Sequence, residues 1–225
     1  MLGIFITGTD TDVGKTWVSK SLIKLLIKKG FDVVPRKPVE SGWKTDETLS
    51  DAWVLASAAN KTEQLDKICP NRFKAPLSPD RAAMLENKIL LINDLKKQCL
   101  QGVNKGQFLY VEGAGGFYSP LCSDGLNKDL AKVLGLSIVL VVNDRVGCIN
   151  HTLLTIEAIE KSKLSLLAIV LNKVDNTTEG DDTGVSAMDN QADLQKRCKY
   201  PVISLAHNQE SSEPFEKSLS EIFAI

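Results

Sequence analysis

Three segments of the sequence carry residues whose types and spacing suit chemistry on phosphates, and the first is the loop Gly8–Thr16. It lies between a strand-like run, residues 2–7, and a helix-like run, residues 15–29. The backbone N–H groups of such a loop can surround phosphate oxygens, and the helix N-terminus adds positive potential. Lys15 would contact the β- and γ-phosphates, and the Thr16 hydroxyl would bind Mg²⁺. Five residues separate the two glycines of the loop, where the common pattern has four, and the alternative is a helix that merely begins after a glycine.

The second segment is Lys37–Gly42, which follows a predicted strand over residues 31–36. Pro38 biases Lys37 toward an extended backbone, which would hold the lysine side chain in one direction. A lysine at a strand end that faces the phosphate loop can neutralise a phosphoryl group in transfer. Taken alone, Lys37 is more typical of a solvated surface lysine, but the neighbouring phosphate loop favours the catalytic interpretation.

The third segment is Glu112–Gly116, which follows a short apolar strand over residues 108–111. P-loop enzymes hold their magnesium with an acid at this kind of position, more often an aspartate than a glutamate. The glycines would let a substrate approach the backbone closely. Asp51 is a further carboxylate at the start of a predicted helix, where its ordinary role would be an N-cap.

A fourth segment, Asn172–Asp175, follows a buried-type strand and has the pattern N-K-x-D. P-loop GTPases read the guanine base with this pattern at this place. Four residues match easily by chance, so the segment indicates base recognition but leaves the choice between ATP and GTP open.

Short β-rich runs alternate with helix-like stretches, which is typical of a parallel sheet covered on both faces. We therefore expect one α/β domain over residues 1–225, with a mostly parallel central sheet and ligands at the carboxyl ends of its strands. A loop is expected over residues 68–79, and an exposed loop in the first half of residues 174–195. The predicted strands cover residues 2–7, 31–36, 108–111, 137–142, 164–171 and 201–205, and the predicted helices cover residues 15–29, 51–59, 88–100, 129–134, 151–161 and 215–223.

Composition excludes several classes of protein. Lys and Arg number 27 against 28 Asp and Glu, a net charge of −1 that argues against a nucleic-acid binder. No apolar run approaches the 18 or more residues of a membrane span, and the N-terminus lacks the features of a signal peptide, so a cytoplasmic protein is expected. Five scattered cysteines and two histidines offer no zinc-binding cluster.

Taken together, the segments resemble the dethiobiotin synthetase family, P-loop enzymes of biotin synthesis. The marks occur in the family's order and cover the chain to about residue 172, and the five-residue spacing of the phosphate loop is the family's own form. These marks are Gly8–Thr16, Lys37–Gly42, Ser50–Ala52, Val111–Gly116 and Gly147–His151.

The resemblance implies an ATP-dependent cyclo-ligase that forms carbon–nitrogen bonds. Such enzymes carboxylate one amine of 7,8-diaminopelargonate with CO₂, and the carbamate attacks the γ-phosphate of ATP. The second amine then closes the ring of the carbamic–phosphoric anhydride, which releases phosphate. The resemblance also implies Mg²⁺ and a homodimer, in which the segment before a helix, Gly147–Asn150, binds the carboxylate tail of the substrate across the interface. The ordinary role of Asn150 would be the N-cap of that helix.

The resemblance assigns residues as well. The implied catalytic residues are Lys37, Lys15 and Thr11, with Thr11 between the carbamate and the phosphates. The implied metal ligands are Thr16, Asp51 and Glu112. The implied substrate contacts are Lys37, Ser41, Gly115, Cys148, Ile149 and Asn150. The implied nucleotide contacts are Asp12, Val13, Gly14, Lys15, Thr16, Trp17, Asp51, Glu112, Gly113, Ala114, Gly115, Asn172 and Lys173.

Two alternatives share the phosphate loop: a partitioning-type switch ATPase and a GTPase, each acting through a protein partner. Partitioning ATPases carry a signature lysine five residues before the loop lysine, where this chain has Asp10. Neither alternative explains the Lys37–Gly42 and Glu112–Gly116 segments. The chain also departs from the dethiobiotin synthetase pattern after Pro201, where an expected Pro-x-Leu is missing, so the base contacts there stay open. Asn172 and Lys173 match the family's base-binding position and Asp175 adds a GTPase-like feature, so we expect ATP to be preferred and GTP to be tolerated.

Overall fold

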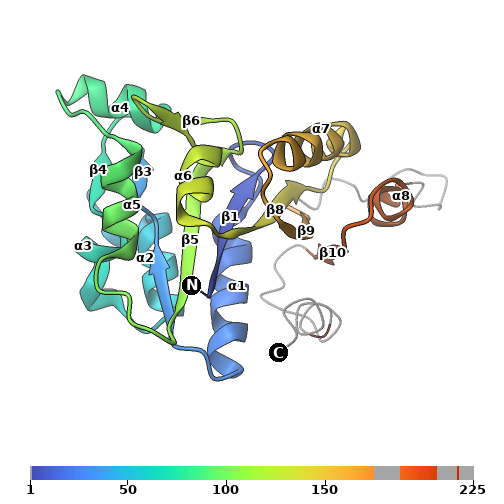
Figure 1. Ribbon diagram of the computed structural model, residues 1–225, viewed down its shortest axis with the longest axis horizontal. Helices are drawn as coiled ribbons and strands as arrows, with labels where there is room; N and C mark the ends of the chain where they lie inside the picture. Colours follow the sequence, from blue (N-terminus) through green and yellow to red (C-terminus); the bar gives the residue numbers. More distant parts are fainter. Residues whose placement is uncertain (1, 175–187, 207–216, 218–225) are drawn as a thin grey trace.

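The computed structural model describes residues 2–174, 188–206 and 217, and its centre is a six-stranded parallel sheet (Figure 1). The strand order is β10-β9-β8-β1-β5-β2, so the chain starts in the middle of the sheet, passes to the edge strand β2 and returns to place β5 between β1 and β2. It then adds β8, β9 and β10 outward on the other side of β1. Parallel neighbours need crossover connections, and helices supply them. The strands are β1 (Gly3–Gly8), β2 (Val33–Arg36), β5 (Phe108–Gly116), β8 (Ser137–Asn143), β9 (Leu166–Asn172) and β10 (Val202–Leu205).

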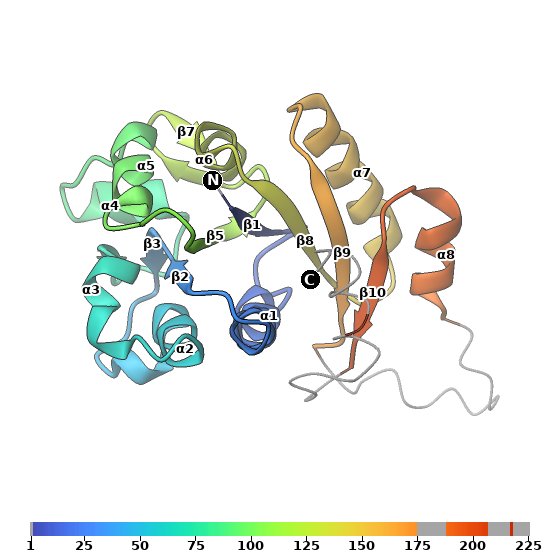
Figure 2. The ribbon, with the colours of Figure 1, turned by 60° about the horizontal axis from the view of Figure 1, so that its bottom comes forward.

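Helices cover both faces of this sheet, which confirms the expected α/β class (Figure 2). Alternate residues of β1 pack on opposite sides: Ile4 and Ile6 join a core cluster with α1 and α2, whereas Phe5 joins the cluster that contains α5, α6 and α7. The helices are α1 (Lys15–Lys28), α2 (Asp51–Ala58), α3 (Leu65–Ile68), α4 (Pro79–Leu85), α5 (Ile92–Leu100), α6 (Asn127–Leu134), α7 (Cys148–Lys161) and α8 (Asn190–Arg197). In the described part of the chain, no helix is both long and apolar enough to cross a membrane.

Smaller elements complete the described chain. The first pair, β3 (Val39–Ser41) with β4 (Asn71–Phe73), is parallel, and β6 (Pro120–Cys122) with β7 (Gly125–Leu126) is antiparallel. Two 3₁₀ turns, Glu47–Leu49 and Thr62–Gln64, flank α2.

Several predicted boundaries were wrong, each because tertiary pairing overrides local composition. The expected loop over residues 68–79 contains β4, which pairs with β3. The strand predicted to end at Val111 continues through the glycines to Gly116, because β1 pairs with it as far as Gly8. The expected helix over residues 88–100 begins only at Ile92, and α4 and α8 were not predicted. The helix expected over residues 215–223 and the loop over 175–187 lie outside the described residues, apart from Lys217.

The phosphate loop closes against the end of β9 at Gly14. This glycine has a φ of +84° as the N-cap of α1, in the left-handed region. A Cβ atom at this position would collide with Nδ2 of Asn172. That amide in turn donates a hydrogen bond to the carbonyl oxygen of Val13 at 3.1 Å. Only glycine lets the strand end approach the loop this closely.

We expect Gly14→Ala to destabilise the protein more than Gly30→Ala does. Gly30 has a similar φ of +90°, but a Cβ atom added there would meet no other atom within 4 Å. The Gly30 variant should therefore lose only the backbone term, about 1–2 kcal/mol, whereas the Gly14 variant must also displace Asn172. Urea unfolding of both variants measures the difference, and equal losses would contradict a close contact between loop and strand.

Candidate active site

The carboxyl ends of β1, β2 and β5 open into a cleft of about 380 Å³, which brings together the three segments singled out in the sequence. A parallel sheet aligns these strand ends on one edge, so loops that are distant in sequence become neighbours. The lining residues are Thr11, Asp12, Gly14, Lys15, Thr16, Lys37, Glu40, Ser41, Asp51, Ala114 and Gly115.

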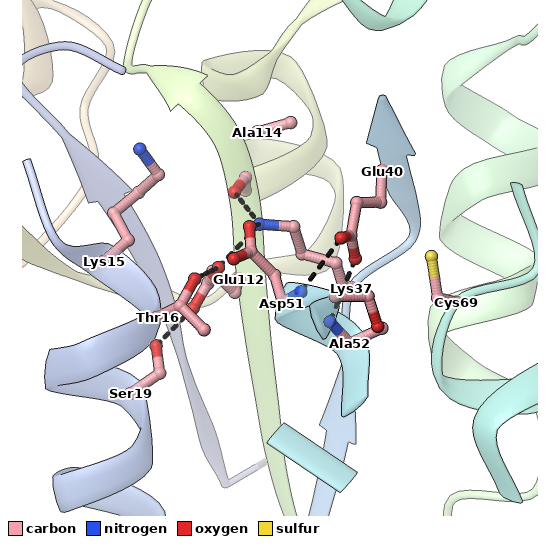
Figure 3. A network of polar contacts seen from close by, with 12 residues as sticks. Lys15, Thr16, Ser19, Lys37, Glu40, Asp51, Ala52, Cys69, Glu112 and Ala114 are labelled. Atoms are coloured by element: carbon pink, nitrogen blue, oxygen red, sulfur yellow. Dashed lines mark hydrogen bonds and ion pairs between the residues drawn. The ribbon is translucent and has the colours of Figure 1, made fainter. Parts of the chain in front are cut away.

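Lys37 lies at the centre of a buried charge cluster (Figure 3). The lysine is 2% exposed, and its Nζ is 2.7 Å from Oδ2 of Asp51 and 2.6 Å from Oε1 of Glu112. Burial alone would lower the pKa of Lys37, but the carboxylates of Asp51, Glu112 and Glu40 together raise it above its ordinary value. Lys37 is therefore a fixed ammonium ion, and the alternative of a solvated lysine is wrong.

Glu112 is held through both of its carboxylate oxygens. Its Oε1 accepts hydrogen bonds from the Thr16 hydroxyl at 2.8 Å and from Lys37, while its Oε2 accepts one from the Ser19 hydroxyl at 2.5 Å. The glutamate itself is fully buried within β5. Thr16 and Ser19 are three residues apart on α1 and so share one face of that helix.

Asp51 reaches Lys37 because two other residues satisfy the start of α2. Ser50 is the N-cap, since its Oγ accepts from the backbone N–H of Trp53 at 3.1 Å, so the expected capping role of Asp51 is wrong. Glu40 accepts from the N–H groups of Asp51 and Ala52, each at 2.9 Å. The Asp51 carboxylate is thereby left to face the cleft, with 46% of its side chain exposed.

The pKa values of these two carboxyls shift in opposite directions. Burial raises the pKa of Glu40, and the attraction of Lys37 offsets this only in part. Burial would also raise the pKa of Asp51, but the charge of Lys37 and the hydrogen bond from it lower the value below its ordinary range. Asp51 is therefore an anion over the whole physiological range.

Sequence reasoning did not identify Ser19 or Glu40 as functional. Ser19 could have been found from its spacing to Thr16, which places both hydroxyls on one helical face. Glu40 lies inside the Lys37–Gly42 segment, but its binding to the start of α2 depends on a tertiary contact across eleven residues.

Lys15 lies within the phosphate loop, and its Nζ donates to the carbonyl oxygen of Asp10 at 3.1 Å. Burial is the largest cause that lowers its pKa to about 8, and the charge of Lys37 lowers it further. Thr11 and Asp12 are exposed residues of the same loop that line the cleft. A phosphate bound here would meet two ammonium groups on opposite walls.

The remaining predicted nucleotide contacts surround this loop to different degrees. Val13 is buried, whereas Trp17 packs against the core cluster of α1 and does not line the cleft. The backbone N–H of Lys173 donates to Leu205 at 3.0 Å, which ties the base-recognition segment to β10. Gly113 packs beside Asn127, whose Oδ1 would be 2.5 Å from an added Cβ.

The segment Cys148–Asn150 does not line this cleft. It forms the first turn of α7, whose N-cap is Gly147 with a φ of +89°. Asn150 is exposed inside that first turn, so its expected capping role is wrong. The helix therefore begins three residues earlier than predicted. The N–H group of Cys148 donates to the carbonyl oxygen of Arg145 at 3.0 Å, so the N–H groups that the first turn can offer are those of Gly147, Ile149 and Asn150.

We expect the affinity for ADP in the absence of metal to fall as the pH rises above about 8. A bound phosphate favours charged lysine and raises its pKa, so a neutral Lys15 must take up a proton when ADP binds. Calorimetry in two buffers of different ionisation enthalpy measures this uptake. Lys15→Arg stays protonated throughout and should show none; equal uptake in that variant would assign the titration to another group.

Comparison with known proteins finds relatives that match nearly the whole chain. A family model described as an AAA domain matches residues 2–214. The chain is 39% identical to an ATP-dependent dethiobiotin synthetase from Anaeromyxobacter sp. (strain Fw109-5), over 95% of this chain and 93% of the relative. It is 34% identical to one from Vesicomyosocius okutanii, over 99% and 97%.

Solved structures with the same fold include the septum site-determining protein MinD from Pyrococcus horikoshii. It covers 98% of this chain and 96% of its own, with a TM-score of 0.55 and 17% identity. A plasmid partition protein from Borrelia burgdorferi covers 99% and 98%, with a TM-score of 0.54 and 10% identity. These similarities show a shared fold alone. The sequence identity of 34–39% to dethiobiotin synthetases, over nearly the whole chain, shows the family. The chain belongs to the ATP-dependent dethiobiotin synthetase family.

Proposed function

We propose that the cleft around Lys37 joins 7,8-diaminopelargonate and CO₂ in an ATP-dependent reaction that closes the cyclic urea of dethiobiotin. The observation that carries this proposal is the buried Lys37 ammonium, which Asp51 and Glu112 hold in the same cleft as the phosphate loop. A fixed ammonium at this place can attract both a phosphoryl group and a substrate carbamate.

The chemistry brings two anions together, because a substrate carbamate must attack the γ-phosphate of ATP. Two unit charges 4 Å apart repel by about 1 kcal/mol in water and by several times that in a drier site. Lys15 and Lys37 would offset this repulsion and stabilise charge that develops during transfer. In this proposal Lys37 and Ser41 hold the carbamate end of the substrate, and Thr11 lies between the carbamate and the phosphates. Gly115 is a further substrate contact, and all four residues line the cleft.

ATP would bind through residues 12–17 and the glycine-rich end of β5. The buried amide of Asn172 lies against the phosphate loop, which supports a place for the nucleotide between the loop and β9. We propose that ATP is preferred and GTP tolerated; Asp175, the GTPase-like residue, lies outside the described residues.

The donor set at the bottom of the cleft suits Mg²⁺, which prefers oxygen ligands and usually keeps waters and substrate phosphates. We propose Thr16, Asp51 and Glu112 as its protein ligands. The oxygens of Asp51 and Glu112 already converge on one positive group, the Lys37 ammonium, at 2.7 and 2.6 Å. When bound, Mg²⁺ would act as a Lewis acid on the phosphoryl oxygens.

We further propose a homodimer in which the first turn of α7, at Cys148–Asn150, binds the substrate carboxylate in the partner's site. A helix start with free N–H groups suits a carboxylate. Two observations support the placement in trans: this turn does not line the cleft of its own chain, and Val146 and Leu154 are exposed beside it.

Phosphate release from Mg-ATP should depend on both bicarbonate and 7,8-diaminopelargonate. Omission of either substrate should reduce the rate to a slow background, because no carbamate then reaches the γ-phosphate. A coupled assay for free phosphate measures this directly. Release that ignores the diamine would contradict the ligase and favour the switch ATPase.

Two lysine variants serve as matched controls for that assay. Lys37→Ala should keep nucleotide binding but lose turnover by on the order of a hundred-fold, as expected when one preorganised charge is removed. Lys15→Ala should weaken both ADP binding and turnover. Unchanged turnover in Lys37→Ala would remove this lysine from the catalytic residues.

Mixing two inactive variants should restore activity if the site is shared between subunits. Asn150→Asp suits a helix N-terminus but should repel the substrate carboxylate, and so raise KM for the diamine at least ten-fold. Co-refolding it with Lys37→Ala gives heterodimers with one intact site, about a quarter of the wild-type sites. Activity no higher than the sum of the two variants would contradict binding in trans.

A further inference from the structure

Ser19 has a contact that neither the family resemblance nor the proposed ligand set explains. Its hydroxyl is fully buried on α1 and donates to Oε2 of Glu112 at 2.5 Å (Figure 3). The residue lies outside the sequence segments that mark the family, and it does not line the cleft. It therefore reaches the site only through Glu112.

The two oxygens of Glu112 have separate partners. Oε1 accepts from Thr16 and from Lys37, and this is the oxygen that shares the Lys37 ammonium with Asp51. Oε2 accepts from Ser19 on the other side of the carboxylate. The terminal torsion of a glutamate is broad, so packing alone fixes its orientation poorly. A donor on each oxygen removes that freedom.

We propose that Ser19 is a positioning residue, which holds Glu112 so that Oε1 faces the metal and phosphate side of the cleft. This inference rests on the proposed function, because it assigns Glu112 to Mg²⁺. Both side chains are 0% exposed, so no bulk solvent replaces a lost hydroxyl, and an unsatisfied carboxylate oxygen would remain. Outer-shell partners of metal ligands typically change metal affinity by 10- to 100-fold when they are removed.

Ser21 provides a matched control on the same helix. It is also a buried serine, but its hydroxyl donates back to the carbonyl of Trp17 at 3.4 Å, the ordinary contact of a helical serine with the preceding turn. Replacing either serine with alanine removes one buried hydroxyl from α1. Only Ser19→Ala should affect the metal site.

The test measures the Kd of ADP with Mg²⁺ and with EDTA in the full-length protein. The Kd in EDTA divided by the Kd with Mg²⁺ gives a ratio that reports metal binding. Ser19→Ala should lower the ratio by about ten-fold or more, while the Kd in EDTA stays close to wild type. Ser21→Ala should leave the ratio unchanged. Ser19→Cys, with a similar volume and a weaker donor, should fall between serine and alanine and also serves if the alanine variant is too unstable to titrate.

Glu112→Gln tests the proposed metal site separately from the role of Ser19. If the wild-type ratio is near one, or if Glu112→Gln keeps the wild-type ratio, the proposed metal site is wrong. If the ratio falls in Glu112→Gln but is unchanged in Ser19→Ala and Ser19→Cys, only the role of Ser19 is overturned. An equal loss of ADP affinity with and without Mg²⁺ in Ser19→Ala would also overturn that role, because it indicates a merely structural serine. Adding Ser19→Ala to Glu112→Gln should have no further effect on the ratio if Ser19 acts only through Glu112.

Discussion

The ion cluster of Lys37 with Glu112 and Asp51 is the interaction on which the rest of this structure depends. Taking a charged group out of water costs several kcal/mol, and the cost is recovered only if opposite charges and hydrogen bonds meet it with good geometry. Lys37 follows β2 directly, Glu112 lies in β5, and Asp51 begins α2. If one of these elements moved away, a buried charge would lose its partner at a cost of about 3–5 kcal/mol. The fold and the site therefore share one constraint.

The surrounding elements meet that constraint from several directions. The pairing of β2 with β5 sets the spacing between Lys37 and Glu112. Glu40 binds the first two N–H groups of α2 and so fixes where Asp51 points. On the other side, α1 contributes Thr16 and Ser19 to the same glutamate. Each contact is local to one pair of elements, but all of them converge on a single carboxylate cluster.

The sequence was sufficient to predict which strand ends carry chemistry, because a parallel sheet places its carboxyl ends on one edge whatever the loops contain. Lys15 and Lys37 were found in this way and line the cleft, and Glu112 lies against Lys37. The orientation of Asp51 could not be predicted, since a helix-start aspartate caps by default, and only the structure shows that Ser50 takes that role. The glycines after Glu112 favour a turn by composition, yet they continue β5 because β1 supplies hydrogen-bond partners. The roles of these residues in binding and catalysis remain predictions.

The switch-ATPase alternative raises the question of what separates a ligase from a switch when both use the same phosphate loop. A switch needs two conformations of similar free energy, so that nucleotide binding can shift the population from one to the other. In this chain Asp10, at the place of the signature lysine, has its carboxylate and carbonyl engaged by Thr11 and Lys15 of its own loop. The second cation is Lys37, and three neighbouring carboxylates favour its charged state before any ligand arrives. Opening that cluster would leave a buried charge without its partner, which favours a single arrangement of the cleft. A single arrangement suits the proposed reaction, in which two anionic substrates are held in a fixed relation.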